Sequence, residues 1–358
     1  MRGERRKSTV SSSTQSLRMK QSRIPKPLSK KNGWPWQDTV QESRASDGMP
    51  KISIITPSYN QGDYIEETIR SVLLQNYGNL EYIIVDGGST DQTPEILEYY
   101  RPCLTHLIQE PDTGQADAIS KGLKHAGGTV FNWLNSDDTY RPETLNLVGT
   151  KFKNPSTQVL LGRSRIFGND RDRISPGTDI YIDNLEKTIG RARIDQPETF
   201  FKLDRIKEIG GINTKLHYLM DRELWIRYLL TYGLDGAKKI DDVLANFRLH
   251  PNSKTVSQQK GFESENFLLG QTLTGKGATE TFQLLRQMLN SNRQNVDVSA
   301  IAENWLLQQY QISYSERDFT RMSLYLDELR ARNRTWATAK TIINLEARKK
   351  LIQLRQKI

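Results

Sequence analysis

The chain has 358 residues, with 51 Lys and Arg against 42 Asp and Glu, and a formal net charge of +9. This length suits one large domain, or a domain with an accessory module. The single cysteine, Cys103, excludes an internal disulfide and a cysteine-based zinc site. The sequence contains no run of about 18 apolar residues and no apolar segment after its basic N-terminus. We therefore expect a cytoplasmic protein without a transmembrane helix or a secretory signal.

The positive charge is concentrated at the N-terminus. Residues 1–31 contain ten of the basic residues and one acid, Glu4, which leaves 41 of each sign for residues 32–358. The segment is rich in Ser, Lys and Arg, which predicts a disordered tail over residues 1–48. Such a tail can attract anionic lipid or nucleic acid, or be a solvated charge run. We expect no nucleic-acid binding by residues 32–358, because their charges balance. We also expect the element Trp34-Pro35-Trp36 to dock on the folded body of the protein.

Residues 49–255 alternate between strand and helix patterns. Strands are expected at 51–56, 80–85, 104–109 and 129–134. Helices are expected around Ile65–Leu73, from Thr93-Pro94, and around Ala116–Ala126. This alternation predicts an α/β fold with a mostly parallel sheet flanked by helices. Residues 256–358 are expected to be mostly α-helical.

Two adjacent carboxylates, Asp137 and Asp138, follow the fourth expected strand in the run Asn-Ser-Asp-Asp. Neighbouring carboxylates raise each other's pKa unless a positive charge neutralises them, and Mg²⁺ commonly binds such groups together with substrate phosphates. A turn that caps a helix is the alternative explanation. Ligands of parallel sheets bind beyond the carboxyl ends of the strands. Three polar loops occupy such ends, which favours a metal-dependent site: 56–60, 86–90 and 135–138.

These loops also carry a family resemblance. Residues 54–61, 81–91 and 135–138 resemble the motifs of glycosyltransferase family 2, in the order and spacing of that family. The resemblance extends over residues 50–255 and implies a GT-A fold. It divides the chain into the tail (1–48), a GT-A domain (49–255) and a helical C-terminal region (256–358).

The resemblance implies a nucleotide-sugar donor and assigns residues to it. Asp86 matches the carboxylate that accepts a hydrogen bond from the base, a directional, charge-assisted contact. Lys121 lies in a segment that resembles a second nucleotide contact, although a helical salt pair with Asp117 is the alternative. The loop that resembles the cradle for base and ribose contains Thr56, Pro57, Tyr59 and Asn60.

Within the acidic run, the resemblance places Asp137 near the ribose and diphosphate and makes Asp138 the metal ligand. Asn135 stands where family members commonly have Asp, so we assign it no metal role. The segment 247–255 resembles the one that closes the site, and its His250 is a candidate second ligand for Mn²⁺ or Mg²⁺. A packing or surface histidine is the alternative. The other histidines, including His217, are assigned no role.

On the acceptor side, residues 196–201, 210–213 and 219–225 resemble the family's acceptor motifs. Asp221 matches the general base, with Glu223 as a weaker candidate and a helix-initiating Asp as the alternative. The implied reaction is a metal-dependent, inverting transfer to a hydroxyl of a carbohydrate or lipid-linked acceptor, in cell-surface polysaccharide or glycolipid assembly. The metal would neutralise the leaving diphosphate, and Asp221 would take the hydroxyl proton.

Two other functions stay open. A sugar nucleotidyltransferase would carry a glycine-rich phosphate loop after the first strand, where this chain has only Gly62. A degenerate family member could act as a scaffold, but the presence of Asp137, Asp138 and Asp221 argues against it. Oligomeric state is not predicted.

The last segment, residues 338–358, has the pattern of a basic amphipathic helix. It can lie on an anionic membrane at the cytoplasmic face, pack on the body, or pair with another subunit.

Overall fold

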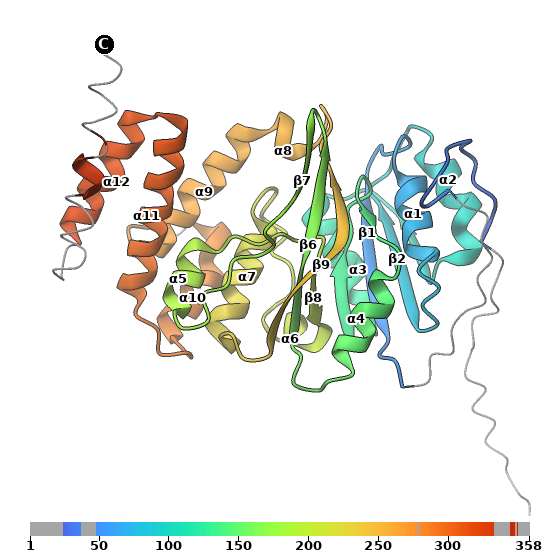
Figure 1. Ribbon diagram of the computed structural model, residues 1–358, viewed down its shortest axis with the longest axis horizontal. Helices are drawn as coiled ribbons and strands as arrows, with labels where there is room; N and C mark the ends of the chain where they lie inside the picture. Colours follow the sequence, from blue (N-terminus) through green and yellow to red (C-terminus); the bar gives the residue numbers. More distant parts are fainter. Residues whose placement is uncertain (1–23, 37–47, 278, 333–343, 348, 350–358) are drawn as a thin grey trace, which may run out of the picture.

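The computed structural model describes residues 24–36, 48–277, 279–332, 344–347 and 349 (Figure 1). A nine-stranded sheet forms the centre of the molecule. Figure 1 shows the C-terminal helices at the end of the molecule opposite to α1 and α2. None of the helices in these ranges combines the length and apolar character needed to cross a bilayer.

The N-terminal part of the sheet is parallel, with strand order β3-β2-β1-β4. The four predicted strands are therefore confirmed, as are the helices between them. The strands are β1 (Ile52–Ser58), β2 (Leu80–Asp86), β3 (His106–Gln109) and β4 (Val130–Trp133). The helices are α1 (Ile65–Leu73), α2 (Thr93–Tyr100), the short η1 (Arg101–Cys103) and α3 (Gln115–His125).

Beyond β4 the sheet is mixed rather than mostly parallel. β8 (Thr199–Lys202) runs antiparallel to β4 and to β6 (Val159–Gly168), whereas β9 (Ala237–Arg248) runs parallel to β6. β6 also forms a hairpin with β7 (Arg171–Ile174), and β5 (Thr139–Tyr140) pairs with β9. The hairpin turn uses Asn169 and Asp170 at positive φ, the conformation that two-residue hairpins require. The α/β class holds, but the strict strand–helix alternation ends at β4.

Side chains of the parallel strands alternate between two cores, as the pleat of a strand requires. Ile55 of β1 packs in the core that includes α3, α6 (Leu203–Glu208) and α7 (Met220–Tyr232). Ile54 packs in the opposite core with α1, α2 and α4 (Thr144–Phe152). Burial on both faces explains the continuous apolar runs in the sequence.

The C-terminal helices belong to the first of these cores. Buried residues of α9 (Gln259–Leu273), α10 (Gln283–Ser291), α11 (Val298–Glu316) and α12 (Phe319–Ala331) share it with α7. The short η2 (Glu280–Phe282) and α5 (Leu185–Arg191) join the same packing, and α8 (Lys254–Ser257) precedes α9. The predicted helical region is therefore packed on the sheet domain. Most of the predicted basic helix at 338–358 lies outside the described residues.

The segment 24–36 lies against α1. The Arg70 side chain is 1% exposed and donates hydrogen bonds to the carbonyls of Pro25 (2.8 Å) and Pro35 (3.0 Å). Trp34 donates its indole N–H to the carbonyl of Tyr140 at 2.9 Å. A buried guanidinium needs acceptors, and this segment supplies two of them. Trp34-Pro35-Trp36 docks as expected, so this part of the predicted disordered tail is structured; residues 1–23 and 37–47 lie outside the described ranges.

Candidate active site

A cleft of about 760 Å³ opens at the carboxyl ends of β1, β2 and β4. Its other walls come from β6, β9, the loop 194–197, the start of α7, and the segment from 252 to the first turn of α9. This volume is in the usual range for small-molecule sites. The edge of the sheet predicted from the sequence is thus one wall of the cleft, and the C-terminal region supplies part of the opposite wall.

The loop after β1 contributes two kinds of residue. Pro57 and Tyr59 line the cleft, and the Tyr59 side chain is 59% exposed. Thr56 is buried, with its hydroxyl 3.1 Å from that of Tyr82. Asn60 joins this loop to the next one, because its N–H donates to Ser89 Oγ at 2.7 Å and its side-chain oxygen accepts from the Thr90 N–H at 2.8 Å. Pro57 and Tyr59 therefore face the cleft, while Thr56 and Asn60 hold the loop.

Asp86 and Lys121 do not line the cleft. Asp86 is buried, and its carboxylate accepts from the N–H (3.1 Å) and the hydroxyl (2.5 Å) of Ser89. Lys121 Nζ lies 3.1 Å from Glu110 and 3.6 Å from Asp117, which is the helical salt pair weighed as the alternative. Lys121 thus braces the 110–117 loop. That loop brings Asp112 and Gln115 to the cleft wall instead.

The acidic run contains one half-buried carboxylate, Asp137, and one fully buried carboxylate, Asp138. Asp137 lines the cleft, whereas Asp138 is only 1% exposed and accepts a hydrogen bond from the Arg248 N–H at 2.8 Å. Burial raises the pKa of Asp138 well above its usual range, and the neighbouring Asp137 adds to the shift. His250 Nε2 lies 3.0 Å from Asp137 Oδ2. The candidate metal ligands that the fold brings together are therefore Asp137 and His250, and Asp138 faces inward.

The pair of Asp137 and His250 fits a divalent cation. Carboxylate oxygen and imidazole nitrogen are donors that Mn²⁺ accepts, and Mg²⁺ can use a single carboxylate with phosphate oxygens and water. The other ring nitrogen of His250, Nδ1, is buried with no hydrogen-bond partner. Within the described part of the chain, no three His, Cys, Asp or Glu side chains form a closed metal cluster. A cation bound here would need further oxygen donors from a bound substrate or from water.

Asp221 lies across the cleft, in the first turn of α7. The side chain is half-buried, and Oδ1 accepts from the Arg222 N–H at 2.7 Å. Burial raises the pKa of Asp221 to about 6, and the negative charge of Asp195 also raises it. Glu223, the weaker candidate, is completely buried in an ion pair with Arg227 at 2.8 Å and does not line the cleft. Asp221 is the carboxylate on this wall that combines access with a pKa close to neutrality.

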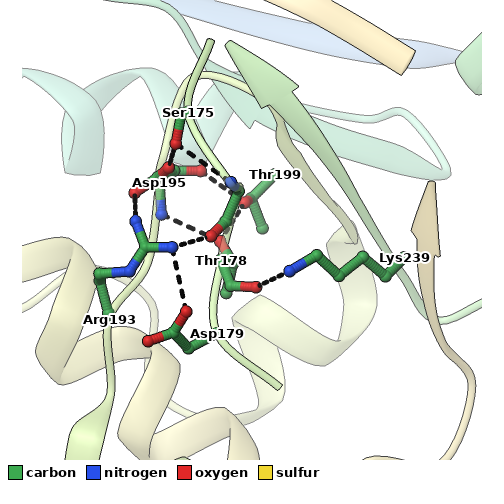
Figure 2. Close-up of polar contacts among 8 residues, drawn as sticks. Ser175, Thr178, Asp179, Arg193, Asp195, Thr199 and Lys239 are labelled. Carbon is green, nitrogen blue, oxygen red and sulfur yellow. Dashed lines mark hydrogen bonds and ion pairs between the residues drawn. The ribbon is translucent and has the colours of Figure 1, made fainter. Parts of the chain in front are cut away.

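A polar network fixes Asp195 beside this wall (Figure 2). The Arg193 guanidinium donates to Asp195 Oδ1 at 2.8 Å and to Asp179 Oδ1 at 3.0 Å. The Ser175 hydroxyl donates to the other oxygen of Asp195, and Lys239 donates to the Thr178 carbonyl at 2.8 Å. The network ties the loop after β7 to β9 and leaves Asp195 on the cleft. The sequence of this loop offered no recognisable pattern.

Two further cleft residues were missed from the sequence. His217, assigned no role, lines the wall next to α7. Lys254 donates to Gln115 Oε1 at 3.0 Å and to the His217 carbonyl at 3.1 Å, and burial lowers its pKa. The position of Lys254 in the 247–255 motif was the available signal. Nothing in the sequence pointed to His217 or Asp195.

Comparison with known proteins adds four findings. The model of the family "Glycosyl transferase family 2" matches residues 53–212. TuaG of Bacillus subtilis (strain 168), named for teichuronic acid biosynthesis, is 43% identical over 238 residues, or 61% of this chain and 87% of TuaG. A glycosyltransferase of Mycobacterium tuberculosis (strain CDC 1551 / Oshkosh) is 30% identical over 186 residues, 51% of this chain and 70% of the relative. The structure of S. aureus TarS with UDP-GlcNAc aligns with a TM-score of 0.54 at 20% identity, over 85% of this chain and 92% of that one. The expected GT-A fold is confirmed.

Proposed function

The chain belongs to glycosyl transferase family 2, and we propose that it is a metal-dependent, inverting enzyme that moves a sugar from a nucleotide donor to a hydroxyl acceptor. The observation that carries this proposal is the arrangement of one cleft. Asp137 lines one region, the buried His250 lies behind it with Nε2 3.0 Å from Asp137 Oδ2, and Asp221 lies on the wall of the acceptor side. The likeness to TuaG supports cell-surface polysaccharide assembly as the setting. We propose a cytoplasmic location; the basic terminal segments expected to contact a membrane lie mostly outside the described residues.

The donor half of the cleft suits a nucleoside diphosphate. Tyr59 offers an exposed ring on which a base can stack, and Asp112 and Gln115 offer polar contacts nearby. Asp137 and His250 would hold Mn²⁺ or Mg²⁺, which when bound neutralises negative charge on the leaving diphosphate. Because Asp138 is turned inward toward Arg248, we propose Asp137 as the carboxylate ligand in its place. TarS binds UDP-GlcNAc, so uridine-diphosphate sugars are the first donors to test.

The acceptor half suits general base catalysis. With a pKa of about 6, Asp221 is ionised at neutral pH yet basic enough to take a proton efficiently. The acceptor oxygen forms a bond to the anomeric carbon as the bond from that carbon to the diphosphate oxygen breaks, and the hydroxyl proton goes to Asp221. One displacement inverts the anomeric centre, and no second carboxylate is needed as a nucleophile.

The test is a screen of nucleotide sugars with purified protein, with and without EDTA, in which the released phosphate compound is identified. We expect release of a nucleoside diphosphate that stops with EDTA and returns with Mn²⁺ or Mg²⁺. Release of pyrophosphate from a nucleoside triphosphate and a sugar phosphate would instead indicate a nucleotidyltransferase. Nucleotide binding without turnover of any donor or acceptor would favour the scaffold alternative.

A further inference from the structure

The residues around Asp221 are held by helix α9, and both Asp221 and α9 lie beyond the family-model match, which ends at residue 212. Glu265 of α9 is 9% exposed, and its carboxylate points at the turn that leads into α7. Oε1 accepts from the His217 N–H at 2.7 Å, and Oε2 accepts from the N–H groups of Tyr218 (3.0 Å) and Leu219 (2.8 Å). Three consecutive N–H groups that converge in this way form a strong site for a negative charge. The carboxylate of Glu265 fills it from 46 to 48 residues away.

The next residue of α9 holds the other side of Asp221. Asn266 accepts a hydrogen bond from Arg222 Nη1 at 2.9 Å, and Gln308 of α11 accepts one from Arg222 Nη2 at 3.0 Å. Arg222 in turn donates its backbone N–H to the Asp221 carboxylate. The backbone before Asp221 and the side chain after it are therefore both attached to the C-terminal helices.

The same turn forms part of the cleft wall. Tyr218 lines the cleft and packs against Phe262 of α9, with ring centroids 5.0 Å apart. A side chain at Gly261 would collide with the Tyr218 ring, since a Cβ there would lie 2.1 Å from it. Helix α9 is thus in close contact with the wall over its first two turns.

We infer that Glu265 is a positioning residue for the catalytic base, and that the C-terminal helices are part of the catalytic unit. The inference rests on the proposed function, in which Asp221 accepts the proton. Without the Glu265 carboxylate, three N–H groups lose their partner and the turn before Asp221 is free to shift. A displacement of about 1 Å at a catalytic group can lower a rate about 100-fold.

The experiment compares Glu265→Ala and Glu265→Gln with the control Glu263→Gln. Glu263 lies on the same helix, but its side chain is 61% exposed. Glutamine keeps one acceptor oxygen and places an amide donor against the N–H groups, so its effect should be intermediate. We expect kcat to fall about 10- to 100-fold in Glu265→Ala, with nucleotide Kd and donor KM within about twofold of wild type. The control should behave as wild type.

Hydrogen exchange provides a readout that does not need turnover. The amides of residues 217–219 should exchange at least about tenfold faster in Glu265→Ala than in wild type, while strands β1 and β2 stay protected. Unchanged kcat, or a loss of nucleotide binding as large as the loss of kcat, would overturn the inference. If the wild-type protein transfers no sugar, the proposed function fails. In that case, unchanged amide exchange at residues 217–219 in Glu265→Ala would separately show that Glu265 does not hold this turn.

Discussion

The donor half and the acceptor half of the cleft are held in place differently. In the donor half, neighbouring loops bind each other: Asn60 contacts Ser89 and Thr90, and Asp86 contacts Ser89 three residues later. In the acceptor half, Asp221 depends on residues from α9 and α11 that come more than 40 positions later. The donor half is therefore built from the ends of adjacent parallel strands, whereas the acceptor half is completed only when the C-terminal helices pack. Changes in the two halves should have separable effects.

The largest effect is expected for Asp221→Asn. The amide keeps the shape of the side chain but cannot accept the acceptor proton, so kcat should fall about 10²- to 10⁴-fold. Binding of the donor nucleotide should stay within about twofold, because Asp221 lies in the acceptor half. Steady-state kinetics together with isothermal titration with a nucleoside diphosphate measure both. Wild-type turnover in this variant would remove Asp221 as the base.

The buried ion pair of α7, behind the acceptor half, should contribute more to stability than an exposed ion pair does. Arg227→Ala leaves Glu223 buried without its partner, and Arg227 also donates to the carbonyls of Ile209 and Gly211. The free energy of unfolding should fall by about 3–5 kcal/mol, as measured by denaturant unfolding. The matched control is Arg165→Ala, which breaks the exposed pair with Asp172 and should cost about 0–1 kcal/mol. Equal losses of unfolding free energy in the two variants would show that the buried pair stabilises the protein no more than the exposed pair.

In the donor half, substitutions of Asp137 and Asp138 should have different effects on metal-dependent nucleotide binding. Asp137→Asn should abolish the thermal stabilisation that a nucleoside diphosphate gives in the presence of Mn²⁺. Asp138→Asn should keep that metal-dependent shift, because its carboxylate accepts from the Arg248 N–H inside the domain. The measurement is the midpoint of thermal unfolding with nucleotide, with and without EDTA. The reverse pattern would restore Asp138 as the ligand.

The smallest expected effect is a shift in the pH dependence of kcat. Asp221 acts as a base only when ionised, so kcat should rise with pH through an apparent pKa of about 6. The charge of Asp195 disfavours ionisation of Asp221, so Asp195→Asn should move this acidic limb to lower pH. The profile of kcat from pH 4.5 to 8 for both proteins measures the shift. A limb that moves upward, or that survives in Asp221→Asn, would show that another group is responsible.

Sequence reasoning was most successful where structure is local. The four parallel strands and the three helices between them follow from apolar runs and helical spacing, and the structure confirms them. The expected capping role of Thr93 is wrong, because α2 begins at Thr93 itself and Gln92 precedes it without a side-chain cap. The strand ends predicted which loops form one rim of the cleft. The prediction was less accurate beyond β4, because the antiparallel pairs of β6 and β8 depend on partners that no local pattern identifies.

The orientation of single side chains was harder to predict. Within a strand, alternation fixes which face of the sheet each side chain occupies. Asp137 and Asp138 come after the end of β4, so this rule does not apply to them. Which of them turns inward is decided by the Arg248 N–H, which β9 brings from 110 residues away. A distant partner also decides the position of His217, which α9 holds at the wall. Lys121 differs, because local salt pairs keep it off the cleft and the pair with Asp117 was the alternative that the sequence offered.

The sequence by itself determined the family, the parallel half of the sheet and the set of polar loops at its edge, because short-range patterns and motif order carry that information. Only the tertiary structure decided which carboxylate faces the ligand, which residues hold Asp221, and that α9 belongs to the cleft. These outcomes depend on hydrogen bonds between segments far apart in the chain, and such bonds form only when packing brings the donors and acceptors together.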